Sequence, residues 1–183
     1  DYTAGEKKEN GGYEMKFKRK LLVFLAAVCL LAGNLAAVPV MAEETTGTEA
    51  SVDCTGKYVN IALVVDTTGS MAGDIKTVKE NLSAFVKEIA ASGAIPRIAL
   101  IEYKDIQCDG DDSTVVHKTP DYSVWYDDTD QMIAEIAELD AYGGGDSPES
   151  LVDALGYVTN DSVMTFNRYA AKFAFVLTDA AYN

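Results

Sequence analysis

Basic residues are scarce in this sequence, which has 15 Lys and Arg against 29 Asp and Glu and a formal net charge of −14. A chain this acidic repels phosphate backbones and anionic membrane surfaces, so we expect no nucleic acid among its partners. The acidic excess suits an ordinary soluble surface and also suits a domain that gathers cations. With 183 residues, 48% of them hydrophobic, the chain has room for one domain with a sizeable core.

Histidine and cysteine are also scarce, with one His and three Cys. We interpret His117, which lies in a strand-like stretch, as a structural residue. Cys54 precedes the first predicted strand and Cys108 follows the second, so parallel strands of eight residues separate them by about 26 Å. A disulfide needs Cα atoms about 4.4–6.8 Å apart. Unless the loop after the second strand makes a long excursion, or partners come from elsewhere, we expect no bridge between them.

Residues 15–42 have the pattern of a secretory signal peptide. Met15 is followed by the basic segment Lys16–Lys20, then by an apolar run over Leu21–Ala37, and then by Val40-Met41-Ala42 with compact residues at its first and third places. A basic start, an apolar middle and a small-residue exit are the three parts of such a peptide. The pattern predicts an exported protein, secreted or at the cell surface.

An uncleaved membrane anchor is the alternative interpretation of this segment. Gly33 and Asn34 interrupt the apolar run and no basic stop follows it, so we favour cleavage and expect no membrane insertion of the mature domain. Residues 1–14 precede a complete signal peptide, and we interpret them as a translated upstream leader. Residues 43–55 are mostly small and polar, and we interpret them as a linker.

From residue 56 onward, strand and helix patterns alternate. Residues 58–65 are rich in β-branched residues and nearly all apolar, like a strand covered on both faces of a parallel sheet, and residues 97–103 are predicted to be a second buried strand. Apolar residues at three- and four-residue steps predict a helix over 75–89. The other predicted elements are a short strand at 114–117 with 124–126 as its return, a helix over 129–139, a helix that begins at Ser147 and a buried strand over 172–179. This order predicts an α/β fold with a doubly wound, mostly parallel sheet and helices on both faces.

Two of the connecting segments are expected to be loops. Asp109–Ser113 begins like a calcium loop, but the places where an EF-hand needs Gly and Glu hold Thr114 and Pro120. We therefore expect a solvated acidic loop over residues 105–113. The three consecutive glycines Gly143–Gly145 are expected to form a flexible loop.

Hydroxyl and carboxylate side chains follow the first and last predicted strands. Asp66, Thr68 and Ser70 alternate along one turn, and Asp179 ends the last strand. Ligands of open α/β sheets sit beyond the carboxyl ends of the strands, where these oxygens can converge. Such ligands suit Mg²⁺, Mn²⁺ or Ca²⁺, and the absence of His and Cys from the set argues against zinc or copper. The alternative is a purely structural role, with Asp66 as a turn residue and Thr68 as the cap of a helix that begins near Met71.

The segment Asp66–Ser70, DTTGS, resembles the Asp-x-Ser/Thr-x-Ser signature of the metal-ion-dependent adhesion site in von Willebrand factor A (VWA) domains. Asp179, in LTDA, resembles the later strand-end aspartate of that family. The run GGGDSPES resembles the third metal loop of a bacterial and hemicentin-like subset, where the family usually supplies a Thr. Here Asp146 and Ser147 are both candidates, and we favour Asp146 because its charge strengthens a hard-metal site.

The resemblance, which covers residues 56–183, implies a Rossmann-like fold and a non-enzymatic function. It implies binding of a protein ligand whose Asp or Glu carboxylate completes the coordination of Mg²⁺, Mn²⁺ or Ca²⁺. A metal-dependent hydrolase of the haloacid-dehalogenase type is one alternative, but those enzymes have a second Asp as general acid where this chain has Thr68. A metal-stabilised structural part of a larger surface protein, without a ligand of its own, is the other.

The sheet of this family normally continues through two further strands after the one that ends at Asp179. We therefore expect residues 56–183 to be a partial domain whose last strand is an unpaired edge. Residues 43–183 alone are expected to be marginally stable and prone to aggregation. A cooperative melt of a monomer would contradict this expectation.

Overall fold

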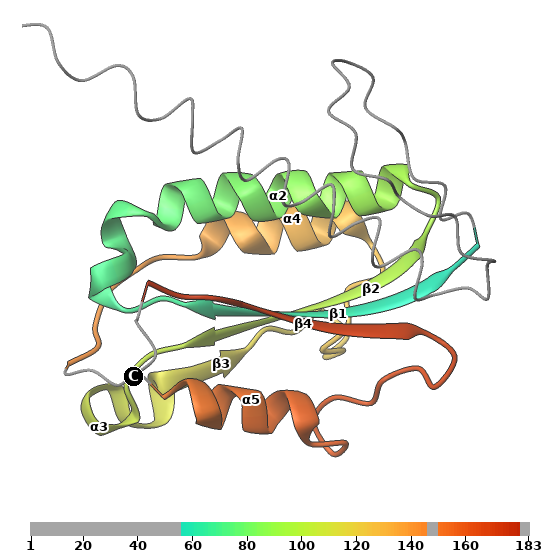
Figure 1. Ribbon diagram of the computed structural model, residues 1–183. Helices are drawn as coiled ribbons and strands as arrows, with labels where there is room; N and C mark the ends of the chain where they lie inside the picture. The colour runs from blue at the N-terminus through green and yellow to red at the C-terminus, as the bar shows by residue number, and fades with distance from the viewer. Residues whose placement is uncertain (1–55, 146–149, 180–183) are drawn as a thin grey trace, which may run out of the picture.

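A computed structural model describes residues 56–145 and 150–179 of the chain (Figure 1). The predicted leader (1–14), signal peptide (15–42) and linker (43–55) lie outside the described residues. So do both candidates of the third loop, Asp146 and Ser147. Cys54 also lies outside them, so its predicted lack of a bridge to Cys108 is not tested.

The described residues form a four-stranded sheet with helices on either side. The strands are β1 (Tyr58–Asp66), β2 (Ile95–Tyr103), β3 (Thr114–Val116) and β4 (Ala171–Leu177), and the helices are α2 (Ile75–Ala91), α3 (Ile106–Asp109), α4 (Thr129–Glu138) and α5 (Leu151–Thr159). Two short 3-10 segments, η1 (Gly69–Gly73) and η2 (Gly110–Ser113), complete the set.

The strand order is β3-β2-β1-β4, with β1 parallel to both of its neighbours and β3 antiparallel to β2. Asp66 at the end of β1 is in register with Tyr103 at the end of β2, and Val65 is in register with Leu177 at the end of β4. The carboxyl ends of all three parallel strands therefore lie at the same edge of the sheet. The prediction of a mostly parallel α/β sheet is confirmed.

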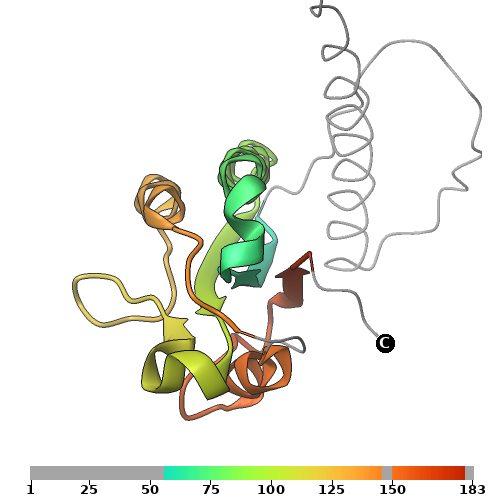
Figure 2. The same cartoon turned by 90° about the vertical axis from the view of Figure 1, so that its left-hand side faces the viewer.

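Helices cover both faces of the sheet, as predicted. Helices α2 and α4 pack side by side on one face, whereas α5 lies across the other, with α3 beside it (Figures 1 and 2). Residues of β1 that alternate along the strand, such as Ile61 and Leu63, face the first layer, while Ala62 and Val64 face the second. Because β1 is buried on both faces from Val59 to Asp66, it forms the centre of the core.

The prediction that the last strand is buried on both faces is wrong for the described residues. Along β4, half-buried residues alternate with exposed ones, and Val176 is 37% exposed. Phe173, Phe175 and Leu177 pack toward the α2 layer, where the ring of Phe175 meets that of Phe85 edge to face with centroids 5.2 Å apart. The opposite face of β4 has no comparable cover within the described residues. Among these residues β4 is an edge strand of the sheet and pairs with β1 alone.

The sequence pattern predicted that segment 124–126 pairs with 114–117, and this prediction is wrong. The segment pairs with β2 instead. Backbone N–H groups and carbonyls of Ile98 and Tyr126 exchange two hydrogen bonds, of 3.0 and 2.8 Å. Strand β3 pairs with the other end of β2, where the His117 N–H also donates to the Leu100 carbonyl. The two segments thus follow one another along the same edge of β2.

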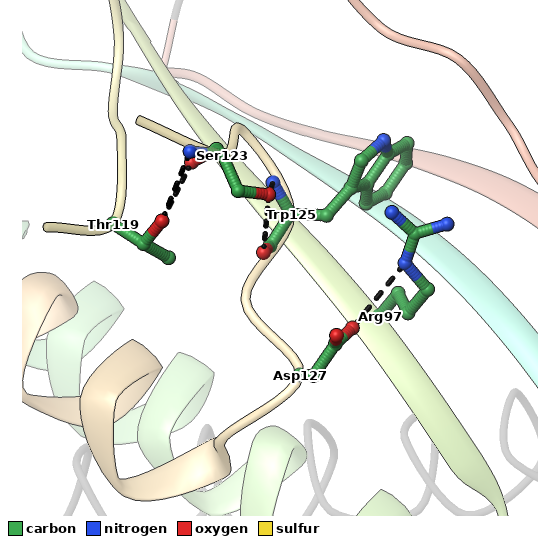
Figure 3. A network of polar contacts seen from close by, with 5 residues as sticks. All are labelled: Arg97, Thr119, Ser123, Trp125 and Asp127. Atoms are coloured by element: carbon green, nitrogen blue, oxygen red, sulfur yellow. Dashed lines mark hydrogen bonds and ion pairs between the residues drawn. The ribbon is translucent and has the colours of Figure 1, made fainter. Parts of the chain in front are cut away.

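A polar network holds the loop between these two segments (Figure 3). The Ser123 N–H donates to the Thr119 hydroxyl, and the Trp125 N–H donates to the Ser123 hydroxyl. The guanidinium of Arg97 lies 5.2 Å from the centroid of the Trp125 ring and forms an ion pair of 3.2 Å with Asp127. The Trp125 side chain, 5% exposed, is thereby held against the second core layer.

Two further predictions on local structure are settled in the described residues, and a third is not tested. Helix α4 occupies the predicted segment, and its N-cap is Asp128, whose carboxylate accepts from the N–H groups of Asp130 and Gln131. Residues 106–113, expected to be a solvated acidic loop, are instead helical, as α3 and η2. Helix α5 begins at Leu151, and its predicted start at Ser147 lies outside the described residues.

None of the helices within the described residues is long and apolar enough to cross a membrane.

His117 joins three elements of the fold, in keeping with a structural role. Its Nδ1 lies 2.6 Å from a carboxylate oxygen of Glu135 on α4, and its Nε2 lies 2.7 Å from one of Glu102 on β2. Burial lowers the pKa of His117, but the hydrogen bonds and charges of the two carboxylates outweigh it and raise the pKa above its ordinary value. Burial also acts on Glu102 and raises its pKa, yet the contact with His117 gives a net lowering. The cluster therefore favours a protonated imidazole between two carboxylates.

The contacts of His117 with Glu102 and Glu135 predict that the free energy of unfolding falls as the pH rises above neutral. A raised His pKa stabilises the fold below the unfolded value of 6.5, and this contribution is lost as the pH rises through the folded pKa. A lowered Glu pKa contributes above 4.5 and is lost at lower pH, so the cluster stabilises most between these two values. We expect the free energy of unfolding in urea to fall between about pH 6 and about pH 9 in the wild type, and less so in His117→Gln. Equal slopes in the two proteins would contradict this, since the chain has one His.

Candidate metal centre

The carboxyl edge of the sheet gathers four of the five side chains predicted to bind a metal; the fifth, Asp146, lies outside the described residues. Asp66 is the last residue of β1 and is fully buried, and Thr68 is 2% exposed on the turn that follows. Ser70 lies in η1, and Asp179 comes two residues after the end of β4. Because β4 lies beside β1 in parallel register, residues far apart in the sequence meet at this edge.

A continuous series of short contacts between oxygen atoms connects these four residues. One Asp66 carboxylate oxygen, Oδ1, accepts from the Thr68 N–H at 3.0 Å and from the Thr68 hydroxyl at 2.7 Å. The Thr68 and Ser70 hydroxyl oxygens lie 3.1 Å apart, and the Ser70 hydroxyl donates to Asp179 Oδ1 at 3.1 Å. The structure therefore brings Asp66, Thr68, Ser70 and Asp179 within contact of one another.

Thr178 joins this set, although the sequence interpretation left it out. Its hydroxyl donates to the second Asp66 oxygen, Oδ2, at 2.7 Å. Both oxygens of the buried Asp66 carboxylate thus have donors, which fix the plane of the carboxylate. The signal that could have found Thr178 was its place directly before Asp179, at the tip of a strand parallel to β1.

The capping alternative for the Thr68 side chain is wrong. Thr68 stands at the N-cap of η1, but its side chain makes no capping hydrogen bond; the bond from the Met71 N–H goes to its backbone carbonyl. The Thr68 hydroxyl is directed instead to Asp66 and Ser70. Asp66 does take part in a local turn through the Thr68 N–H, so it has a structural role in the described structure whatever else it binds.

The glycine loop, expected to be flexible, is packed against the Asp66–Ser70 turn. Gly143 accepts from the Gly69 N–H at 3.0 Å, and the Tyr142 N–H donates to the Thr67 carbonyl at 3.0 Å. Gly143 and Gly144 have φ of 73° and 76°, where other residues are strained. A Cβ added to Gly144 would lie 2.9 Å from the Thr68 side chain. Glycine is needed here for close approach, so the loop lies next to the candidate site.

The donor set fits a hard divalent cation. It offers two carboxylates and two hydroxyls, whose oxygens suit Mg²⁺, Mn²⁺ or Ca²⁺, and it contains no His or Cys. Among the described residues no group of three or more His, Cys, Asp and Glu side chains is arranged to hold a metal.

The inner residues of the site are buried and the outer ones are exposed to solvent. Asp66 and Thr68 are buried, whereas Ser70 and Asp179 are exposed. A cation held between them would have protein oxygens on its inner side and an open outer side. That arrangement leaves coordination positions for water or for a ligand from outside.

Comparison with known proteins identifies the family of this chain. Residues 60–183 match the von Willebrand factor A domain, and the chain belongs to this family. VWA domains are typically protein-binding modules and usually lack catalytic activity. Over 92 residues, 50% of the chain, the sequence is 37% identical to a putative ariadne-like RING finger protein of Acanthamoeba polyphaga mimivirus. The chain spans only 8% of the length of that protein.

Proposed function

We propose that this chain is an exported VWA module that binds a protein ligand through a divalent cation. Asp66, Thr68, Ser70 and Asp179 would hold the cation, Mg²⁺ or alternatively Mn²⁺ or Ca²⁺, and Asp146 would add a ligand from the third loop. The observation that supports this most is the series of oxygen atoms in contact from Asp66 through Thr68 and Ser70 to Asp179 at the edge of the sheet. Export rests on the signal-peptide pattern of residues 15–42.

The residues of the proposed site have two roles: a carboxylate attracts the cation, and neutral hydroxyls leave part of the charge of the cation uncompensated. Asp66 supplies buried negative charge, and its orientation is fixed by Thr68 and Thr178. The hydroxyls of Thr68 and Ser70 are neutral ligands, so they leave much of the charge of a cation uncompensated. When bound, the cation supplies a positive charge on the exposed side that an Asp or Glu carboxylate of a partner can coordinate.

The hydrolase alternative finds no support at the position that decides it. Haloacid-dehalogenase chemistry needs a general acid two residues after the first aspartate, where Thr68 donates its hydroxyl to Asp66. The single histidine is held between Glu102 and Glu135 and supplies no base at this edge. Binding, rather than catalysis, is the function that these residues support.

A peptide-display selection tests the proposed function. We expect peptides selected on the protein in Mg²⁺ to carry an Asp or Glu and to be released by EDTA. Replacing that residue by Asn or Gln is expected to weaken binding more than about a hundredfold, since the charged ligand of the cation is lost. The matched protein control is Asp161→Ala, which removes an exposed carboxylate after the C-terminal end of α5.

Two outcomes would contradict the proposal. Peptides that stay bound in EDTA would show recognition without a metal, and peptides that tolerate the amide replacement would show recognition without a carboxylate. A protein that binds Mg²⁺ but selects no peptide would favour the purely structural, metal-stabilised alternative.

A further inference from the structure

Asp109, on α3, contacts the glycine loop, which also contacts Thr68. Its Oδ2 accepts from the Gly144 N–H at 2.9 Å, and the same oxygen lies 3.3 Å from the Asp105 N–H. A Cβ added to Gly143 would lie 2.4 Å from Asp109 Oδ1, so the carboxylate lies directly against this glycine. The glycine loop therefore contacts both the Asp109 carboxylate and the Asp66–Ser70 turn.

The contact between Gly144 and Thr68 restricts the Thr68 side chain. Because a Cβ on Gly144 would lie 2.9 Å from both Cβ and Cγ2 of Thr68, the Gly144 backbone occupies the space beside the Thr68 methyl group. A Thr side chain has three staggered rotamers, and close packing of its methyl group selects among them. In the observed rotamer, the Thr68 hydroxyl contacts both Asp66 and Ser70.

We infer that Asp109 is a positioning residue for the candidate metal site. Its carboxylate holds Gly144 against the Thr68 methyl group, and Gly144 in turn keeps the Thr68 hydroxyl directed toward Asp66 and Ser70. Asp109 acts through hydrogen bonding to a backbone N–H and is not itself a ligand. The inference rests on the proposed function only where it concerns metal affinity, since the contacts of the loop with Asp109 and Thr68 are contacts between protein groups.

Three neighbouring contacts of the loop do not replace the bond between Asp109 and Gly144. The Tyr142 ring lies 3.6 Å from the Lys104 ammonium, and the Tyr142 N–H bonds to Thr67, so both fix the residue before the glycines. Gly143 is held by the Gly69 N–H through its carbonyl. The Gly144 N–H has Asp109 as its acceptor, so loss of this carboxylate frees the loop at the residue that contacts Thr68.

Two substitutions distinguish the hydrogen bond that Asp109 accepts from the effect of its negative charge. Asp109→Ala removes the acceptor, whereas Asp109→Asn removes the charge and keeps a carbonyl oxygen that can accept from Gly144. In metal-free protein, we expect amide exchange of Gly144 to rise about tenfold in Asp109→Ala, as for the loss of one hydrogen bond to a charged acceptor. Three-bond couplings of Thr68 are expected to show rotamer averaging in this variant. Asp161→Ala is the control for net charge, and it should change neither signal.

Mg²⁺ affinity, measured by calorimetry, is expected to fall about tenfold in Asp109→Ala and to stay within about threefold of wild type in Asp109→Asn. Unchanged Gly144 exchange and Thr68 couplings in a folded Asp109→Ala protein would overturn the inference. Equal losses in both variants would also overturn it, because the charge alone would then be responsible. If the wild type binds no Mg²⁺, the proposed function fails, while the metal-free measurements still decide the role of Asp109.

Discussion

Replacing Asp66 by alanine is expected to abolish Mg²⁺ binding measured by calorimetry. Asp66 is the fully buried member of the site, and both of its oxygens are oriented by donors from Thr68 and Thr178. Loss of a group that only supports a metal ligand already costs about 10–100-fold in affinity. Removal of the charged ligand itself should exceed that range.

The alanine variant also leaves three donors without their acceptor, at a cost of about 1–3 kcal/mol for each buried group that stays unsatisfied. Asp66→Asn provides the matched variant, because its amide oxygen still accepts from Thr68 while the charge is gone. We expect Asp66→Asn to fold and to lose most of its Mg²⁺ affinity, and Asp161→Ala to keep wild-type affinity. Wild-type affinity in folded Asp66→Asn would remove Asp66 from the site.

Among the substitutions proposed here, replacing Trp125 by alanine is expected to lower the free energy of unfolding most, by about 3–5 kcal/mol. The ring is 5% exposed, meets Phe166 edge to face with centroids 4.9 Å apart, and lies under the Arg97 guanidinium. A small domain is stable by only about 5–15 kcal/mol, so this loss is a large fraction of the total. Urea unfolding followed by circular dichroism measures it, since the variant lacks the single Trp of the chain.

Trp125→Phe is the matched control for this prediction. In the described part of the chain the indole Nε1 is buried without a hydrogen-bond partner, so a phenyl ring gives up no hydrogen bond and keeps aromatic contact with Phe166. We expect the Phe variant to lose about 1 kcal/mol. Equal losses for Phe and Ala would show that the packing of the ring contributes little.

The layered fold could be predicted because its signals are local in the sequence. The apolar β1 and β2 segments indicate strands covered on two faces, and the periodicity of α2 indicates a helix with one buried side. Pairing at the outer edge of β2 could not be predicted in the same way. Residues 114–116 and Tyr126 both pair with β2, because the connecting loop carries the chain along that strand, and this depends on contacts such as that of Arg97 with Trp125.

The burial of β4 was overestimated because its composition does not reveal its neighbours. Its residues are mostly apolar, which is typical of a strand covered on both faces, yet exposed and half-buried residues alternate along it. Which faces of a strand are covered depends on the elements that pack on it, and the Phe85–Phe175 contact places the cover of β4 on the α2 side.

At the candidate site, the sequence predicted the residues at strand ends and missed those that hold them. Asp66, Thr68, Ser70 and Asp179 follow from strand-end positions in a parallel sheet. Asp109 had no such signal, because its bond to Gly144 depends on residues 106–109 being helical, where a loop was expected. The close packing of Gly144 on Thr68 likewise joins two turns that are distant in the sequence.

Paramagnetic broadening by Mn²⁺ tests most directly whether the carboxyl edge of the sheet binds a divalent cation. With so many acidic residues, the protein offers many weak sites, so location matters more than stoichiometry. At substoichiometric Mn²⁺ we predict that the amide signals of Gly69, Ser70, Gly144 and Asp179 disappear first, and that excess Mg²⁺ restores them. Broadening that begins at the exposed acidic segment 127–130, or that spreads evenly over the acidic surface, would contradict the proposed metal centre.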